Sequence, residues 1–426
     1  MPTGNSVIKK HIACIITLFA SALLVLTGIF NSCNSAFYDI ALKFKDGFLP
    51  STDGGKGKQL VQIDINENAI GQLPQGINAW ENLAQIFSYL NEENSGILLP
   101  TFFAENAPAT PKRKILGQMQ MSSCVVLPAE PVPNEVIPYL SQDISLAQKK
   151  AIEKHLCYPR VLNGQKIAKA ERLVIPSDEF NRFASTIAFV CTPQDTDKDG
   201  VLRRMNVFYA YSDGYIPSFA FVAASKILGI KQDSIVLDCG NKLTFSCEDG
   251  SEYKIPVDGE GRILVPYTSK ELFPKINFEY FSQAFSDADL SYQINTLLKG
   301  KTAVVTDSTF ERSRGAQNFF LSPLGSTITE NTAELCLLNA FLENSFFGIY
   351  PVYAKYAILF FTVCIIFFAS LSRRKLTFFL ACIFLIILIA AAELFVFVYM
   401  NIAPWIAGPI PVILAGFIFE LIRRSL

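Results

Sequence analysis

The residues whose types and spacing could support metal chemistry lie in one short run, 195–200 (DTDKDG). Alternating aspartates followed by glycine open a calcium-binding loop, because the carboxylates converge on the ion and glycine allows the sharp turn. The rest of such a loop is missing, since Arg203 would be its ninth residue and Asn206 its twelfth, where a bidentate Glu is needed. Arg203 and Arg204 would also place positive charge beside the ion. We therefore expect an Asp- and Gly-rich turn between two strands, without a metal.

The chain holds little that could carry out catalysis. Its only histidines are His11, next to a long apolar run near the N-terminus, and His155. A Ser-His-Asp or Cys-His arrangement in the central part of the chain would therefore have to use His155. There is no CxxC pair, no GxxxxGKS/T phosphate loop and no GxGxxG after a predicted strand. We therefore predict that the protein is not an enzyme and uses no cofactor.

Charged residues at predicted strand ends and turns are the candidates for ligand binding. Ligands of open α/β sheets bind outside the carboxyl ends of the strands. For each candidate, helix capping or a solvated surface position is the alternative interpretation. The candidates are Asp64, Glu67, Asp178, Asp199, Arg203 and Arg204.

Seven cysteines lie outside the apolar ends of the chain, and an odd number cannot all pair within one molecule. Cys239 and Cys247 flank a predicted hairpin (CGNKLTFSC), which makes them the candidate disulfide. Buried free thiols are the alternative interpretation for the others.

Strand and helix patterns alternate through the middle of the chain. Residues 58–65 (KQLVQIDI) read as a buried strand, and residues 80–90 (WENLAQIFSYL) place their apolar side chains on one helix face. Further strands at 96–99 and 124–127 suggest strand-helix-strand units with right-handed crossovers. We therefore predict an α/β domain with a mixed sheet flanked by helices.

Two stretches of this domain have less regular patterns. Prolines and polar residues at 128–159 indicate a surface excursion. Residues 201–211 read as one strand that turns at 212–214 into a helix at 218–228, and Pro217 suits the start of that helix because its missing N–H is not needed there.

Four apolar runs are long enough to cross a membrane as helices, since about 20 residues at about 1.5 Å each span the hydrocarbon layer. The first run could instead be a secretory signal, but its apolar core is longer than such signals require, so we interpret it as an uncleaved anchor. The predicted transmembrane helices are 12–30, 352–371, 376–400 and 405–422.

Positive charges set the predicted orientation. Basic residues at 9–10, 373–375 and 423–424 all fall on one side if the chain crosses four times, and the positive-inside rule makes that side the cytoplasm. The predicted soluble parts are a cytoplasmic N-terminus at 1–11, an extracytoplasmic domain at 31–351 and a cytoplasmic end at 423–426.

Glu393 is the only full charge between Leu376 and Met400. An ionisable group inside the bilayer is costly unless it finds a partner. Packing against another helix is one interpretation, and coupling of a signal through the helices is the other. Glu393 is therefore the candidate coupling residue of the membrane part.

Several segments resemble a known family, the second type of CHASE domain, an extracellular sensory domain of bacterial adenylyl cyclases and histidine kinases. The resemblance is clearest over Leu173–Ile230, with a helix, a strand of small residues, an Asp-Gly turn followed by Arg, and a further helix. It extends to VQIDINENAI, IPVDGEGRILVPY and LLKGKTAVVTDST, and to the three closing apolar runs. Departures include Pro100 where an Asp is usual and Thr306-Asp307 where Ile-Gly is common.

The resemblance implies a multi-pass sensor or receptor subunit of the bacterial cytoplasmic membrane, dimeric, with an unknown small-molecule or protein signal. Family members usually continue into a cyclase or kinase, whereas this sequence stops at Leu426, so we expect an output protein supplied as a separate chain. A truncated receptor remnant and a structural envelope protein without a ligand are the alternatives. Because acidic residues outnumber basic ones between 31 and 351, no nucleic-acid partner is expected.

Overall fold

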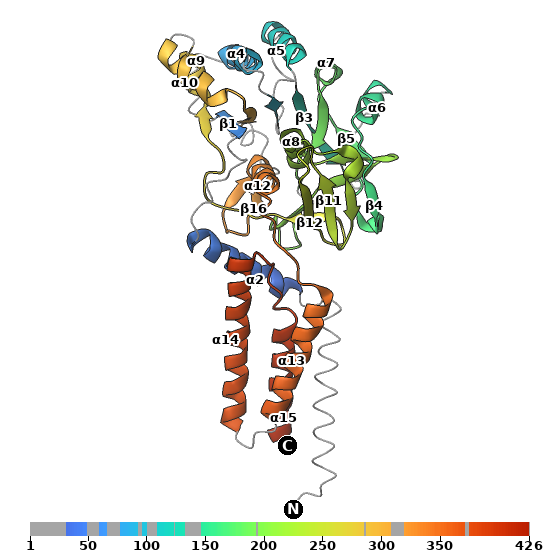
Figure 1. Cartoon of the computed structure of the whole chain (residues 1–426), viewed down its shortest axis with the longest axis vertical. Helices are drawn as coiled ribbons and strands as arrows, with labels where there is room; N and C mark the ends of the chain where they lie inside the picture. Colours follow the sequence, from blue (N-terminus) through green and yellow to red (C-terminus); the bar gives the residue numbers. More distant parts are fainter. Residues whose placement is uncertain are drawn as a thin grey trace, which may run out of the picture. The chain divides into compact units, whose positions relative to one another are not determined.

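The chain forms two compact units in the computed structural model (Figure 1). The domain unit comprises residues 51–346, and the helical unit comprises residues 1–50 and 347–426. The structure describes residues 31–48, 59–65, 77–92, 96–99, 109–122, 124–132, 146–192, 195–284, 287–307, 319–370 and 375–425.

A seven-stranded mixed sheet forms the centre of the domain unit. Six of its strands pair in parallel, in the order β14-β1-β15-β2-β3-β6, and β5 pairs antiparallel with the end of β3. The predicted α/β domain with a mixed sheet is therefore confirmed. The strands are β1 (Leu60–Ile65), β2 (Ile97–Leu98), β3 (Val125–Val132), β5 (Arg172–Val174), β6 (Thr186–Phe189), β14 (Lys275–Asn277) and β15 (Thr302–Asp307).

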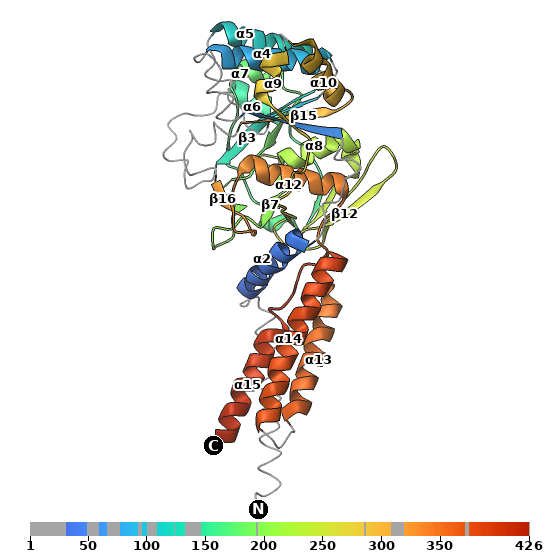
Figure 2. The same cartoon turned by 90° about the vertical axis from the view of Figure 1, so that its left-hand side faces the viewer.

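Successive side chains of each strand point to opposite faces of the sheet, and the apolar ones on one face form the main hydrophobic core. Val61 and Ile63 of β1 point to this face, where they join buried residues of the neighbouring strands. Phe87 lies in the helix that supplies Leu83 and Leu90 to the same core, at the spacing of one helix face. Four helices cover this face: α4 (Ile77–Glu92), α5 (Ala109–Met121), α9 (Phe278–Ala284) and α10 (Ala288–Leu298) (Figure 2).

Two helices lie on the opposite side of the sheet and pack against each other: α8 (Phe219–Leu228) and α12 (Glu330–Glu343) (Figure 2). Each begins at a hydroxyl cap, because the Ser218 Oγ accepts the Phe221 N–H at 3.3 Å and the Thr329 Oγ1 accepts the Thr332 N–H at 3.2 Å. Both helices are largely buried.

Smaller sheets complete the domain unit. A four-stranded sheet has the order β12-β11-β10-β4, and three two-stranded sheets pair β13 with β7, β16 with β17, and β8 with β9. The remaining elements are β4 (Arg160–Leu162), β7 (Arg204–Asn206), β8 (Phe208–Tyr211), β9 (Gly214–Pro217), β10 (Val236–Asp238), β11 (Lys242–Ser246), β12 (Glu252–Pro256), β13 (Arg262–Leu264), β16 (Phe319–Leu321), β17 (Thr327–Thr329), α6 (Leu146–Glu153) and α7 (Asp178–Asn181).

The predicted single strand at 201–211 and the predicted helix start were wrong in detail. The strand is divided into β7 and β8, and residues 214–217 form β9, which closes a hairpin with β8 through Ser212 at a positive φ of 53°. Pro217 therefore ends a strand, and Ser218 caps the helix. The surface excursion predicted from residue 128 was also placed too early, because β3 continues to Val132.

The structure does not contain the predicted disulfide between Cys239 and Cys247, and both thiols are free. Cys239 follows β10 at the turn, where Asp238 pairs with Lys242. Cys247 follows the far end of β11, which places roughly 16 Å of strand between them. A disulfide needs Cα atoms within about 7 Å.

Among the described residues, two helices are long and apolar enough to cross a membrane: Tyr353–Ser370 within α13 (Val352–Ser370) and Leu376–Met400 within α14 (Lys375–Met400). The fourth predicted span, 405–422, forms α15 (Pro409–Ser425), which contains only a shorter apolar helix, Pro409–Ile418. It starts four residues later than predicted because residues 406–408, directly before it, form a turn. The predicted span 12–30 lies outside the described residues, so the count of four is not confirmed.

Replacing Phe87 by Ala should lower the free energy of unfolding by about 3–5 kcal/mol, because the side chain is fully buried between α4 and the sheet and its loss leaves a cavity. Urea titration of the full chain in detergent micelles, followed by tryptophan fluorescence, measures the change. Tyr292→Ala is the matched control, since that ring is 74% exposed and its loss should cost less than about 0.5 kcal/mol. Equal effects of the two substitutions would contradict the core assignment.

Candidate functional site

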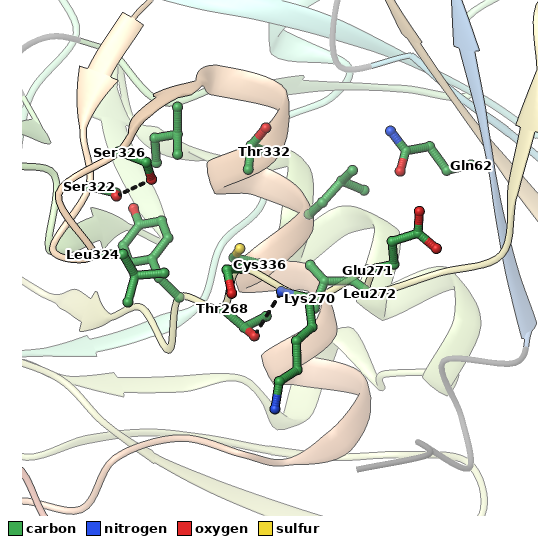
Figure 3. A pocket seen from close by; sticks show the side chains of 14 residues that line it. Gln62, Thr268, Lys270, Glu271, Leu272, Ser322, Leu324, Ser326, Thr332 and Cys336 are labelled. Atoms are coloured by element: carbon green, nitrogen blue, oxygen red, sulfur yellow. Dashed lines mark hydrogen bonds between the residues drawn. The ribbon is translucent and has the colours of Figure 1, made fainter. Parts of the chain in front are cut away.

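A pocket of about 350 Å³ lies in the domain unit between α12, residues 267–272 and the β16–β17 hairpin (Figure 3). This volume is within the range of small-molecule sites. Its lining residues are Gln62, Tyr267, Thr268, Ser269, Lys270, Glu271, Leu272, Ser322, Leu324, Ser326, Ile328, Thr332, Leu335 and Cys336.

The pocket combines apolar and polar walls. Leu335 and Cys336 of α12 are almost fully buried and supply apolar surface. Figure 3 shows the Ser322–Ser326 hydroxyl pair, 3.0 Å apart, at one end and Gln62 with Glu271 at the other. Most of the lining side chains are polar, and polar groups in a ligand site orient the bound molecule.

A chain of polar contacts supports Gln62 from the carboxyl edge of the sheet. The Gln62 Nε2 donates to the Thr306 Oγ1 at 3.0 Å, and that hydroxyl donates to the Asp64 Oδ1 at 2.9 Å. Lys275 completes the chain, with its Nζ 2.7 Å from the Asp64 Oδ2. Asp64, a predicted ligand residue, is buried and lies behind the pocket lining rather than in it.

Three other predicted ligand residues lie together in a separate charge network. The buried Arg203 donates to Asp197 at 3.0 Å and to both oxygens of Asp199 at 2.9 and 2.8 Å. Hydrogen bonding from Arg203 lowers the pKa of the Asp199 carboxyl below its usual range. Arg204 lies 3.6 Å from Asp197 and 3.8 Å from Asp258. These contacts fix the 195–200 turn to the β7–β13 pair, with Arg203 between two of the carboxylates that a calcium loop would direct at the ion.

Asp178, another predicted ligand residue, lies apart from both groups. Asp178 is the first residue of α7, directly after its N-cap residue Ser177. Glu67 lies outside the described residues.

Sequence reasoning missed a buried carboxylate, Glu334 of α12. Its Oε1 accepts the Cys191 N–H at 2.8 Å, just after β6, and its Oε2 accepts the Ala220 N–H at 3.0 Å. Ala220 lies in the first turn of α8, whose N–H groups have no partner within the helix. Glu334 therefore fixes α12 to α8 and to the end of β6. The apolar residues all around α12 were the available signal, since they indicate a buried helix.

The pKa of Glu334 is raised to about 8, chiefly by burial and in part by the nearby carboxyls of Asp195 and Glu330, against the lowering effect of the two backbone N–H groups. Asp195 is also buried, and desolvation raises its pKa. Asp195 accepts the Thr192 N–H at 2.7 Å and the Tyr209 hydroxyl at 3.2 Å. The interior of the domain unit thus holds a group that titrates near neutral pH.

In the helical unit, the buried Glu393 of α14 is partnered. Its Oε2 accepts the Trp405 N–H at 3.1 Å, and the Tyr350 side chain is hydrogen-bonded to the same carboxyl. Tyr350 lies in the segment that leads into α13, and Trp405 lies in the α14–α15 connection. Glu393 therefore joins the entry of α13 to the start of α15.

The domain unit is an α/β module with a ligand-sized pocket, and apolar helices follow it along the chain. The family model of the CHASE2 domain matches residues 15–368, and the chain belongs to the CHASE2 domain family. CHASE2 domains are extracellular sensory domains, as the resemblance in the sequence suggested. Among curated proteins and solved structures there is no match to this chain.

The stability of the domain unit should decrease as the pH rises from about 5 to about 8. Glu334 has an ordinary pKa of 4.5 when unfolded and about 8 when folded, so between these values only the folded state holds the proton. Thermal unfolding of the full chain at several pH values measures the trend. Glu334→Gln cannot ionise and should remove this part of the slope, whereas an unchanged slope would contradict the assignment.

Proposed function

We propose that this protein is a membrane sensor subunit that binds an extracytoplasmic small molecule in the α12 pocket and transmits the change through its apolar helices to a signalling partner. The observation that carries the proposal is the position of the pocket on α12. This helix is the last element of the domain unit, and only eight residues, 344–351, separate its end from α13. Membership of a sensory domain family supports the same function.

The two faces of α12 suit this helix to transmit a displacement caused by ligand binding. Thr332, Leu335 and Cys336 share the pocket face, whereas Glu334 lies on the opposite side of the helix at about 100° per residue. A ligand that contacts the pocket face would displace α12 against the contacts that Glu334 makes. Binding and displacement would then be coupled through two alternative packings of one helix.

The proposed cellular arrangement follows the charge pattern. The spans would lie in a bacterial cytoplasmic membrane with the domain unit outside, and the subunit would act as a homodimer without catalytic activity of its own. Basic residues near the predicted cytoplasmic ends support this orientation.

A survey of small molecules by thermal shift should find compounds that stabilise the full chain, by about 2.7 kcal/mol at a concentration 100 times the Kd. Thr332→Trp should abolish this stabilisation, because the new ring fills the pocket from the exposed first turn of α12. Thr296→Trp, at an exposed position of α10, is the matched control and should leave it unchanged. A shift that persists in Thr332→Trp would place binding elsewhere.

Tyr350→Phe should leave binding intact and weaken transmission, since it removes the phenol that bonds to Glu393. With a compound from that survey, hydrogen–deuterium exchange of amides 405–408 should change in the parent chain and not in Tyr350→Phe. Tyr353→Phe is the control, because that side chain is 77% exposed. An identical exchange response in Tyr350→Phe would exclude Glu393 from the coupling.

A further inference from the structure

Helix α2 (Asn31–Phe48) of the helical unit has three distinct faces. Successive residues turn by about 100°, so residues three, four and seven apart lie on one face. Tyr38, Ala41 and Leu42 are buried on the packed face. The other two faces are a polar face with Asp39, Lys43 and Asp46, and an apolar stripe of Phe37, Ile40 and Phe44.

The packed face fixes α2 at the end of α14. The Tyr38 ring meets Phe347 and Phe397 edge-on, with centroids 5.8 and 5.7 Å apart. The Lys45 ammonium lies 4.9 Å from the centre of the Phe347 ring and donates to the Asn401 side chain. These contacts are made by Tyr38 and Lys45 of the packed face.

The N-terminal part of α2 is fixed to the α14–α15 connection. The Asn34 Oδ1 accepts the Ala407 N–H at 2.8 Å. The position of α2 in the helical unit is therefore determined at two points, at residues 397–401 near the end of α14 and at Ala407 in the connection.

Side chains of the apolar stripe are partly exposed. Ile40 is 63% exposed and Phe44 is 40% exposed, and Phe37 one turn earlier is half-buried. Apolar side chains at this spacing beside a separate polar face are the pattern of helices that lie in a membrane interface.

The apolar stripe lies near the end of the apolar part of α13 and α14. The exposed tyrosines Tyr353, Tyr356 and Tyr399 lie in the first turn or so of α13 and the last turn of α14, and tyrosine is enriched where lipid headgroups meet acyl chains. Below them, α14 exposes Phe384 and Ile387, which need an apolar solvent. Figure 1 shows α2 across this end of α14.

We infer that α2 is an interfacial helix whose Phe37–Ile40–Phe44 stripe is buried in the headgroup–acyl boundary of the membrane. The occupant is lipid rather than a second copy, because three side chains cover far less than the roughly 800 Å² per partner of a stable protein interface. The inference rests on the membrane attachment in the proposed function. It adds that the segment before the domain unit is held at a fixed depth, about 5–10 Å into the boundary.

The test adds one tryptophan at a time to the full chain, which keeps its native Trp80 and Trp405, and reconstitutes each variant and the parent into phosphatidylcholine vesicles with acyl chains brominated near the headgroup or near the methyl end. Ile40→Trp and Phe44→Trp should each add fluorescence that the shallow bromines quench more strongly than the deep ones. Lys43→Trp, on the polar face of the same helix, should be quenched less than half as much. Phe384→Trp, in the middle of α14, should be quenched most by the deep bromines.

The outcomes separate the two proposals. If Phe384→Trp is quenched and Ile40→Trp and Phe44→Trp are quenched no more than Lys43→Trp, α2 does not lie in lipid and the inference is overturned. A blue-shifted Ile40→Trp emission without quenching would mean that protein, such as a second copy, covers the stripe, which also overturns it. If Phe384→Trp is not quenched, the membrane attachment itself is wrong.

Discussion

The buried carboxylate of Glu334 holds the interior of the domain unit together. It accepts two backbone N–H groups from separate places, one after β6 and one in the first turn of α8. Because both N–H groups donate to Glu334, the packing of α12 on α8 depends on this side chain. Burying a carboxyl is costly unless its oxygens are bonded, and here both are. The raised pKa of Glu334 reflects the part of the desolvation cost that these two hydrogen bonds do not offset.

Because Glu334 fixes one side of α12, the other side is free to form a wall of the pocket. The pocket face consists of Thr332, Leu335 and Cys336, and Gln62 reaches it from the sheet. The polar chain through Thr306 and Asp64 holds Gln62 in place. The pocket is thus built from β1, the 267–272 segment, the β16–β17 hairpin and α12, which come from three separate stretches of the sequence.

Sequence patterns predicted the central architecture well and the site poorly. The strand at 58–65 and the helix at 80–90 carry strong periodicity, and both exist as β1 and α4. The β8–β9 hairpin was missed because four residues with a Pro at the end resemble a helix start as much as a strand. Of the predicted ligand residues, Arg203 and Asp199 pair with each other, since charges close in sequence satisfied one another locally.

The sequence by itself determined the family, the alternation of strands and helices, and the apolar helices at the end of the chain, because periodicity and hydropathy are local properties. Only the tertiary structure decided which polar groups share an environment. Glu334 and Ala220, or Gln62 and Thr306, meet because of strand order and helix packing, and no local pattern encodes those contacts. The same limit applied to Cys239 and Cys247, which are close in sequence but separated by the length of β11.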